Sequence, residues 1–463
     1  MPNLGFTLLT YPLLSLFQPL TAERIFVSAF IVLLGCSVPL FLRAFDRPAL
    51  PLSYFAFPVV FNFTLLMGFY SYAAAIPLYL MAFAWCWRCR DRSRYLRFAL
   101  YNAAGLALFC CHVIAAVFFI IAVATMATAR QDSRRRLFAE IAELSLLLSP
   151  LLIGLAVWLT QSPLSASAGI GLFSLTRIVD LLIMLATFSS LSLSPWQLLS
   201  TSLVMFLYLA IGYLSVKEIY LRYRSQRAVT EAERTLLRLA SSMTVLFMVA
   251  PFHFGGGGYF NERFPWVLFL LLLPLLQLPA TGYWRRLGPP AIAGAATLAL
   301  AVTATCMWQQ SALVESYRRG LSVAIPRGAI VMAYRAPKQE PWPRVDVLAH
   351  TVSYYALAHG CIDAGNYEVE THYFPVMRKP SAPALPFSGT ILFAPEKIEW
   401  PDFPMIRFVV GWQVDPGSRQ RLDGFFEVIW EEDRLSIWQR RATPTTAPSP
   451  DSPAPAAIPA AHP

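Results

Sequence analysis

Ionisable side chains are rare in the apolar parts of this sequence, and four of them have the chemistry to recognise a phosphate. Arg263, Glu262 and His253 stand together in PFHFGGGGYFNERFP (residues 251–265), and His112 interrupts a long apolar block. A guanidinium binds phosphate oxygens in pairs, while histidine and glutamate can shape such a site by hydrogen bonding. The pattern predicts a site for an anionic lipid headgroup centred on Arg263.

Each of these residues also has a simpler structural interpretation, and the sequence leaves both open. Arg263 precedes an apolar segment, so it can extend to the headgroups as an anchor, with Glu262 as its ion-pair partner. His112 can hydrogen-bond a backbone carbonyl of a neighbouring helix. The four glycines at 255–258 provide flexibility, and they form no nucleotide-binding P-loop because no GK[ST] follows them.

The elements that must position these residues are long apolar blocks. Hydrophobic residues make up 56% of the 463 residues and charged residues only 14%, whereas a soluble domain carries about 25% charged residues. Every block matches or exceeds the roughly 20 residues that cross a hydrocarbon core. The blocks are residues 51–87, 98–129, 144–176, 181–216, 264–284 and 287–314. The sequence therefore predicts a polytopic membrane protein with membrane lipids as partners.

The basic residues are concentrated in short segments between the blocks. These segments are residues 88–97, 130–136, 217–238 and 285–286. Arginine-rich loops of this kind are the positive-inside signature of membrane topology. A nucleic-acid-binding protein would instead collect its positive charge on one folded face. The net charge of +10 therefore indicates membrane orientation and argues against nucleic acid as a partner.

If all basic segments face the cytoplasm, an even number of membrane crossings must separate any two of them. This requirement predicts that the block 51–87 is a hairpin broken near residues 62–68. It also predicts that the block 98–129 bends near residues 110–112. Asn62 at the first break and His112 at the second are therefore candidates for the same outer site.

Single crossings account for the rest of the membrane part. They are expected at residues 25–42, 144–158, 198–216, 239–252, 264–283 and 289–308. Arg177 and Asp180 stand among apolar residues in the segment 172–193, which favours an interfacial helix. The result is an α-helical polytopic membrane protein with about nine or ten membrane helices, some short or broken.

The composition changes after Ser311, where charged residues become frequent. We expect a transmembrane domain at residues 1–310, an extracytoplasmic α/β domain at 311–441 and a disordered Pro/Ala-rich tail at 442–463. Within the α/β domain, strands are expected at 329–333, 391–393, 406–412, 425–430 and 435–440, and an amphipathic helix at 344–357.

The order of these features resembles the bacterial GT-C-type membrane glycosyltransferases, the class related to protein mannosyltransferases and aminoarabinose transferases. The resemblance is carried by AER at 22–24, FPVVFNFTLLMGFYSY at 57–72, the hairpin with His112, Arg263 before a late helix, and FVVGW at 408–412 with FFEVIWEEDRLSIWQRR at 425–441. It implies transfer of a sugar from a polyprenyl phosphate to an acceptor outside the membrane. It also implies a multi-pass protein of the bacterial inner membrane with a periplasmic C-terminal domain.

The sequence departs from this class at the expected catalytic acid. The class carries an Asp in the first exterior loop after a first membrane helix, whereas residues 1–24 contain Glu23 as their one carboxylate. The first aspartate, Asp46, falls in a segment predicted to be cytoplasmic. Glu23 is therefore the candidate general base, and we expect either an N-terminally truncated chain or a non-catalytic relative.

Two other functions remain open on sequence alone, and no cofactor can be named. One is a structural or assembly protein that presents its exterior domain to a partner. The other is a transporter or flippase of a lipid-linked substrate, although the inverted repeats typical of such proteins are not evident. The spacing of His350, His359 and His372 matches no metal-binding motif.

The predicted topology can be tested with reporter fusions. Alkaline phosphatase fused after Pro343 should be active, because that residue is predicted to lie outside the cytoplasm. The same enzyme fused after Arg94 should be inactive, because Arg94 belongs to a basic segment. The reverse pattern of activities would rule out this topology.

Overall fold

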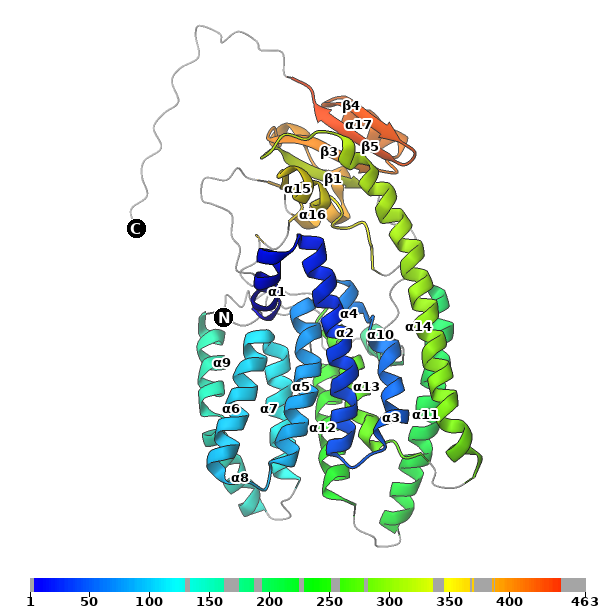
Figure 1. Cartoon of the computed structure of the whole chain (residues 1–463). Helices are drawn as coiled ribbons and strands as arrows, with labels where there is room; N and C mark the ends of the chain where they lie inside the picture. Colours follow the sequence, from blue (N-terminus) through cyan, green and yellow to red (C-terminus); the bar gives the residue numbers. More distant parts are fainter. Residues whose placement is uncertain are drawn as a thin grey trace, which may run out of the picture. The chain divides into compact units, whose positions relative to one another are not determined.

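The computed structural model shows a mostly helical protein with a small C-terminal sheet (Figure 1). It describes residues 4–129, 134–161, 175–186, 194–224, 229–250, 259–278, 282–335, 345–366, 369, 385–386 and 388–442. The chain forms two compact units. Unit 1 contains Met1–Ser311, Glu340–Asp346 and Thr371–Met377, and unit 2 contains Ala312–Gln339, Val347–Glu370 and Arg378–Pro463.

Unit 1 is a bundle of helices (Figure 1). Its helices are α1 (Gly5–Leu16), α2 (Pro19–Ala44), α3 (Ala49–Ser53), η1 (Tyr54–Val59), α4 (Phe63–Leu66), α5 (Tyr70–Arg88), α6 (Arg94–Cys111), α7 (Val113–Thr128), α8 (Arg134–Leu147), α9 (Ser149–Gln161), α10 (Leu175–Ala186), α11 (Pro195–Arg224), α12 (Glu231–Val249), η2 (Asn261–Arg263), α13 (Phe264–Leu272), η3 (Leu273–Leu275) and α14 (Tyr283–Arg318). The last of these continues past residue 311, so its final turns belong to unit 2.

Among the described residues, three helices are long and apolar enough to cross a membrane. They are Pro19–Ala44, Leu199–Arg224 and Tyr283–Ser322. A fourth candidate is the pair Phe138–Leu147 and Ser149–Thr160, which is bent by 74°. The other helices of unit 1 are shorter or interrupted.

Both predicted breaks are present. The block 51–87 is divided among α3, η1, α4 and α5, and the block 98–129 is divided between α6 and α7 at His112. Side chains satisfy the backbone donors that each break exposes. Asn62 accepts from the Leu65 N–H at 3.1 Å, and His112 Nδ1 accepts from the Ile114 N–H at 3.2 Å.

Two of the predicted single crossings are wrong in their extent. Residues 264–283 do not form one helix, because α13 ends at Leu272 and η3 contains Pro274, which cannot continue an α-helical hydrogen-bond ladder. All side chains from Phe264 to Leu271 are buried, so α13 is enclosed by the bundle. The segment 144–158 is also divided, because α8 ends at Leu147 and α9 begins at Ser149.

Unit 2 is built on a five-stranded sheet of order β2-β1-β3-β5-β4. The strands are β1 (Ile330–Arg335), β2 (Ile362–Asp363), β3 (Ile406–Trp412), β4 (Phe426–Glu432) and β5 (Leu435–Arg440). Strand β1 pairs in parallel with β2 and β3, whereas β3 with β5 and β5 with β4 pair antiparallel. The predicted strand at 406–412 and the terminal hairpin are confirmed, and the strand at 329–333 is confirmed with a shift of one or two residues.

Helices cover both faces of this sheet. Val331 and Phe408 face a core that includes Tyr317 at the end of α14 and Tyr355 of α15 (Ser353–His359). A second core on the other face includes Met332, Leu422 of α17 (Pro416–Asp423) and Ile391 of α16 (Ser388–Phe393). Since both faces are covered, the central strands β1 and β3 are mostly apolar, whereas the edge strand β4 alternates buried and exposed residues.

Other expectations for unit 2 are corrected. Residues 391–393 are helical within α16, so the strand predicted there is wrong; a three-residue apolar run carries too little periodicity to separate helix from strand. The helix predicted at 344–357 is shorter, because residues 347–352 form turns before α15. Apart from Ala442, the predicted disordered tail lies outside the described residues.

The packing of Gly320 gives a test of unit 2. A Cβ at this position would lie 2.3 Å from the Tyr355 hydroxyl and 2.8 Å from Ile437 Cδ1. Gly320→Ala should therefore destabilise unit 2 by about 1 to 3 kcal/mol through overpacking. Gly424→Ala is the matched control, because the nearest atom to its Cβ is 3.4 Å away. The protease resistance of unit 2, measured in the full chain as the temperature is raised, should be lost at a lower temperature in Gly320→Ala than in Gly424→Ala. Equal thermal stability of the two variants would contradict this packing.

Candidate functional site

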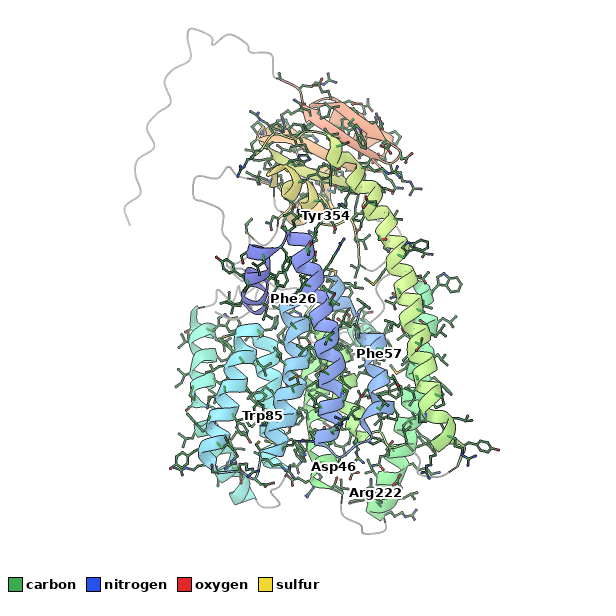
Figure 2. The ribbon with its side chains drawn as sticks, viewed as in Figure 1. Phe26, Asp46, Phe57, Trp85, Arg222 and Tyr354 are labelled. Atoms are coloured by element: carbon green, nitrogen blue, oxygen red, sulfur yellow. The ribbon has the colours of Figure 1, made fainter. Side chains whose placement is uncertain are left out.

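The helices of unit 1 place the basic segments at one end, here called the basic end. Arg88 Nη2 donates to the Arg43 carbonyl at 3.1 Å, and Arg238 Nη1 donates to the Thr128 carbonyl at 2.6 Å. Segments that are far apart in sequence therefore meet at this end. Figure 2 shows Asp46 and Arg222 at this end of the bundle.

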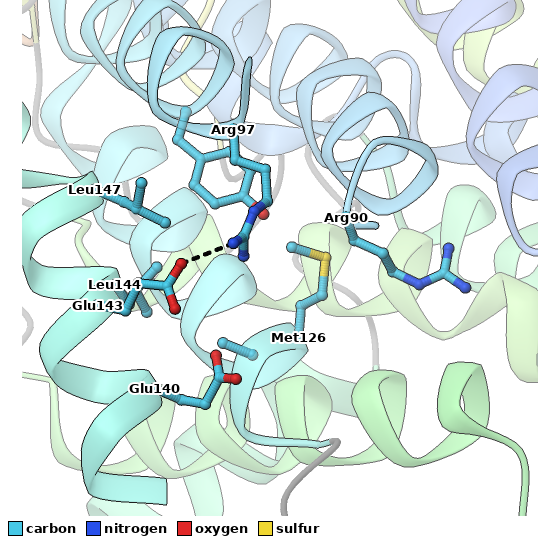
Figure 3. A pocket seen from close by; sticks show the side chains of 9 residues that line it. Arg90, Arg97, Met126, Glu140, Glu143, Leu144 and Leu147 are labelled. Carbon is cyan, nitrogen blue, oxygen red and sulfur yellow. Dashed lines mark hydrogen bonds and ion pairs between the residues drawn. The ribbon is translucent and has the colours of Figure 1, made fainter. Parts of the chain in front are cut away.

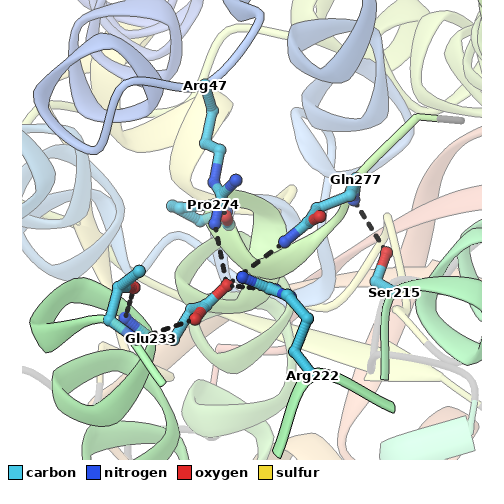
Figure 4. Close-up of polar contacts among 7 residues, drawn as sticks. Arg47, Ser215, Arg222, Glu233, Pro274 and Gln277 are labelled. Carbon is cyan, nitrogen blue, oxygen red and sulfur yellow. Dashed lines mark hydrogen bonds and ion pairs between the residues drawn. The ribbon is translucent and has the colours of Figure 1, made fainter. Parts of the chain in front are cut away.

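A buried carboxylate organises the basic end (Figure 4). Glu233, which is 1% exposed, lies 2.7 Å from Arg222 and 3.5 Å from Arg47, and it accepts from Gln277 Nε2 at 3.2 Å. Its other oxygen accepts from the Thr230 N–H at 3.0 Å, which completes a capping box for α12. This network joins α11, α12 and the segments after α2 and η3. We interpret it as structural, because these polar groups bind one another.

The opposite end of the bundle is here called the His112 end, and it contains most of the residues that the sequence singled out. Arg263 is only 9% exposed. Its guanidinium carbon lies 4.6 Å from the centre of the Phe69 ring and 5.5 Å from that of Tyr72. Arg263 Nη1 lies 3.5 Å from His112 Nε2. We call Arg263, His112, Tyr72 and Phe69 the Arg263 cluster.

Local structure explains how the Arg263 cluster is held in place. Arg263 ends the single 3-10 turn η2, and the Tyr72 hydroxyl donates to its backbone carbonyl. Asn261, at the start of the same turn, donates to the Phe247 carbonyl at 3.0 Å and the Ala250 carbonyl at 2.9 Å. The turn is thereby fixed to both α5 and the end of α12. An arginine that only snorkelled would extend towards lipid, whereas Arg263 packs inside the protein.

The hydrogen bonding of His112 determines what its ring presents to Arg263. Nδ1 accepts from the Ile114 N–H, so Nδ1 carries no proton and Nε2 carries one. Guanidinium nitrogens are donors without acceptor capacity. With this tautomer, the 3.5 Å contact between Arg263 Nη1 and His112 Nε2 is not a hydrogen bond. Both are donors at neighbouring positions, and one acceptor oxygen between them could receive a hydrogen bond from each.

The other residues predicted for the site have different surroundings in the structure. Glu262 is buried beside Arg263 on η2, whereas His253 lies outside the described residues. Asn62 is occupied as a helix cap, with its oxygen also accepting from Thr64 Oγ1 and its amide donating to the Val59 carbonyl at 2.9 Å. Glu23 accepts from the Tyr70 hydroxyl.

Sequence reasoning missed the aromatic part of the Arg263 cluster. Phe69 and Tyr72 stand at the start of α5, within a segment that was read only as a broken hairpin. The signal available was Gly68, whose positive φ of 79° marks the sharp turn that brings α5 back along the bundle. The contact of Phe69 and Tyr72 with Arg263, which is distant in sequence, could not be predicted from any local sequence pattern.

Unit 2 contains its own polar cluster around Asp363. The carboxylate accepts from Ser353 Oγ at 2.7 Å and from the Gly365 N–H at 2.8 Å. Burial raises the pKa of Asp363 despite these hydrogen bonds, which alone would lower it. The contacts tie α15 to β2, so we assign them a structural role.

The described residues contain no group of three or more His, Cys, Asp or Glu side chains placed to hold a metal ion. In comparisons with known proteins, the chain matches no protein-family model, no curated protein and no solved structure.

Two substitutions of His112 separate its structural and binding roles. His112→Asn should keep the cap of α7, because asparagine is a favoured N-cap residue, but should remove the Nε2 donor. His112→Ala should lose both the cap and the donor. Its free energy of unfolding should therefore be about 1 kcal/mol lower than that of His112→Asn. Thermal unfolding of the two variants in one detergent measures this difference. Equal stabilities would show that His112 does not act as a cap.

Proposed function

We propose that this chain is a polytopic membrane protein that binds a phosphate-bearing lipid through the Arg263 cluster. The observation that carries the proposal is the pair of donors at Arg263 Nη1 and His112 Nε2. A phosphate oxygen is an acceptor able to receive both hydrogen bonds.

Exposed aromatic residues support the membrane part of this proposal. Trp196 of α11 is 71% exposed and Trp308 of α14 is 76% exposed. Gln197, next to Trp196, donates to Thr303 at 3.3 Å, and Trp308 lies five residues beyond Thr303, about 7.5 Å along α14. Tyr220 and Tyr283 are exposed near the opposite ends of these helices. Tryptophan and tyrosine are enriched at both membrane–water interfaces.

The spacing of the aromatic residues fits a bilayer. Trp196 and Tyr220 are 24 residues apart, which corresponds to about 36 Å of α-helix. This length lies between the roughly 30 Å of hydrocarbon and the 40 to 45 Å of a whole bilayer. We place the basic end in the cytoplasm on the positive-inside rule, so that the Arg263 cluster and residues 311–441 face the exterior.

The class of reaction that we propose is transfer of a sugar from a polyprenyl phosphate, as the resemblance to GT-C-type glycosyltransferases implies. Glu23 is the carboxylate proposed as base. Glu23 accepts from the Tyr70 hydroxyl at the start of α5, the helix that also contributes Tyr72 to the Arg263 cluster from another face.

Substitution of Arg263 tests lipid-phosphate binding. Arg263→Ala should weaken binding of polyprenyl phosphate about ten- to a hundredfold, since a hydrogen bond to a charged group contributes about 1.5 to 3 kcal/mol. Arg263→Lys should retain charge but lose part of the affinity, because an ammonium lacks the planar fork. Binding is measured for wild type and both variants in one detergent.

Arg407→Ala is the control, because Arg407 is an exposed arginine of β3 in unit 2. Its affinity for polyprenyl phosphate should equal that of the wild type. Equal affinity for Arg263→Ala, Arg263→Lys and wild type would show that Arg263 does not contact the phosphate.

A further inference from the structure

The helix α8 (Arg134–Leu147) exposes large apolar side chains, while its inner side carries two partly buried glutamates beside the buried Leu144 and Leu147. Phe138 and Leu146 are each 70% exposed, and Ile141 is exposed between them. The carboxylates of Glu140 and Glu143 point the other way, towards α6 (Figure 3). Water should favour the opposite arrangement, with the glutamates outside and the large apolar side chains inside.

The inward carboxylates are accommodated by a small polar cavity. Arg97 Nη2 lies 2.7 Å from Glu143 Oε1. Beside this ion pair is a cavity of about 50 Å³ whose lining includes Arg90, Arg97, Glu140 and Glu143 (Figure 3). That space suffices for only a few water molecules. The two glutamates of α8 are thus on its protein-facing side, and the Arg97–Glu143 ion pair holds the rotation of the helix about its axis.

The exposed side of α8 carries no charge along its described length. Its exposed residues are Phe138, Ala139, Ile141, Ala142, Ser145 and Leu146. The helix also turns by 74° from the apolar helix α9, so the two cannot form one straight crossing. The sequence of α8 begins with three arginines, and it lies at the basic end of the bundle (Figure 1).

We propose that α8 lies along the membrane surface at the basic end, with its uncharged face in contact with phospholipid acyl chains. The proposal rests on the membrane insertion proposed above. An interfacial helix buries large apolar side chains at the boundary between headgroups and acyl chains. Arginines at its start suit the anionic headgroups of a cytoplasmic leaflet. The Arg97–Glu143 ion pair orients the helix by holding its polar side against the bundle.

Site-specific photocrosslinking of the full chain in vesicles of phosphatidylethanolamine and phosphatidylglycerol tests this contact. Benzoylphenylalanine is introduced in place of Phe138, Phe206 or Leu357 in separate variants. Phe206 is 65% exposed on α11 and reports insertion of the bundle, and Leu357 is 56% exposed in unit 2 and reports background. The probe at 138 should crosslink to lipid at a yield comparable to that at 206 and well above that at 357.

The controls separate failure of this inference from failure of the proposed membrane insertion. Lipid crosslinks at 206 but only background at 138 would overturn the placement of α8 and leave membrane insertion intact. A crosslinked product with twice the chain's mass, formed by the probe at 138, would also overturn it. Such a product would show that a second copy of the chain covers this face. Background yield at both 138 and 206 would refute membrane insertion itself.

Discussion

The cost of placing an ionised group in apolar surroundings constrains every part of the helical unit. A single buried charge carries a penalty of several kcal/mol unless it is paired. Glu233 is compatible with its burial because Arg222 and Arg47 lie beside it and Gln277 and Thr230 donate to it. Glu143 of α8, which is partly exposed, also pairs with Arg97. Charges at the basic end are therefore arranged in opposite-sign groups, and these groups join elements that are distant in sequence.

The Arg263 cluster follows a different arrangement, which is why we treat it as the binding site. Its described contacts are two aromatic rings and a histidine that presents a donor. A cation over an aromatic ring gains about 0.5 to 2 kcal/mol. The planar guanidinium also suits the oxygens of a phosphate, which is the chemistry that we propose for this cluster.

Sequence reasoning identified helix breaks better than helix lengths, and the physical reason is clear in individual residues. The breaks at Asn62 and His112 follow from an even number of crossings combined with side chains that can cap a helix. The short length of α13 could not be predicted, because its all-apolar sequence looks the same whether it faces lipid or the interior, and prolines such as Pro39 and Pro77 also occur inside longer helices of this chain. The sequence predicted that Arg263 and His112 lie on the same side of the membrane, but it did not predict that they are neighbours. The contribution of Phe69 and Tyr72 depends on tertiary packing, so no local period could reveal it.

The break between α6 and α7 determines one of the donors in the Arg263 cluster. Ending a helix inside an apolar bundle exposes backbone N–H groups, which must find acceptors. At the break between α6 and α7, the Nδ1 atom of His112 meets this need, and the proton on the ring is thereby confined to Nε2. The capping bond fixes the tautomer, and the tautomer in turn makes Nε2 a donor beside Arg263. A serine or asparagine would cap α7 equally well, but neither side chain is long enough to present a second donor there. Histidine at this break thus has two ring nitrogens with different surroundings, one capping α7 and the other beside Arg263.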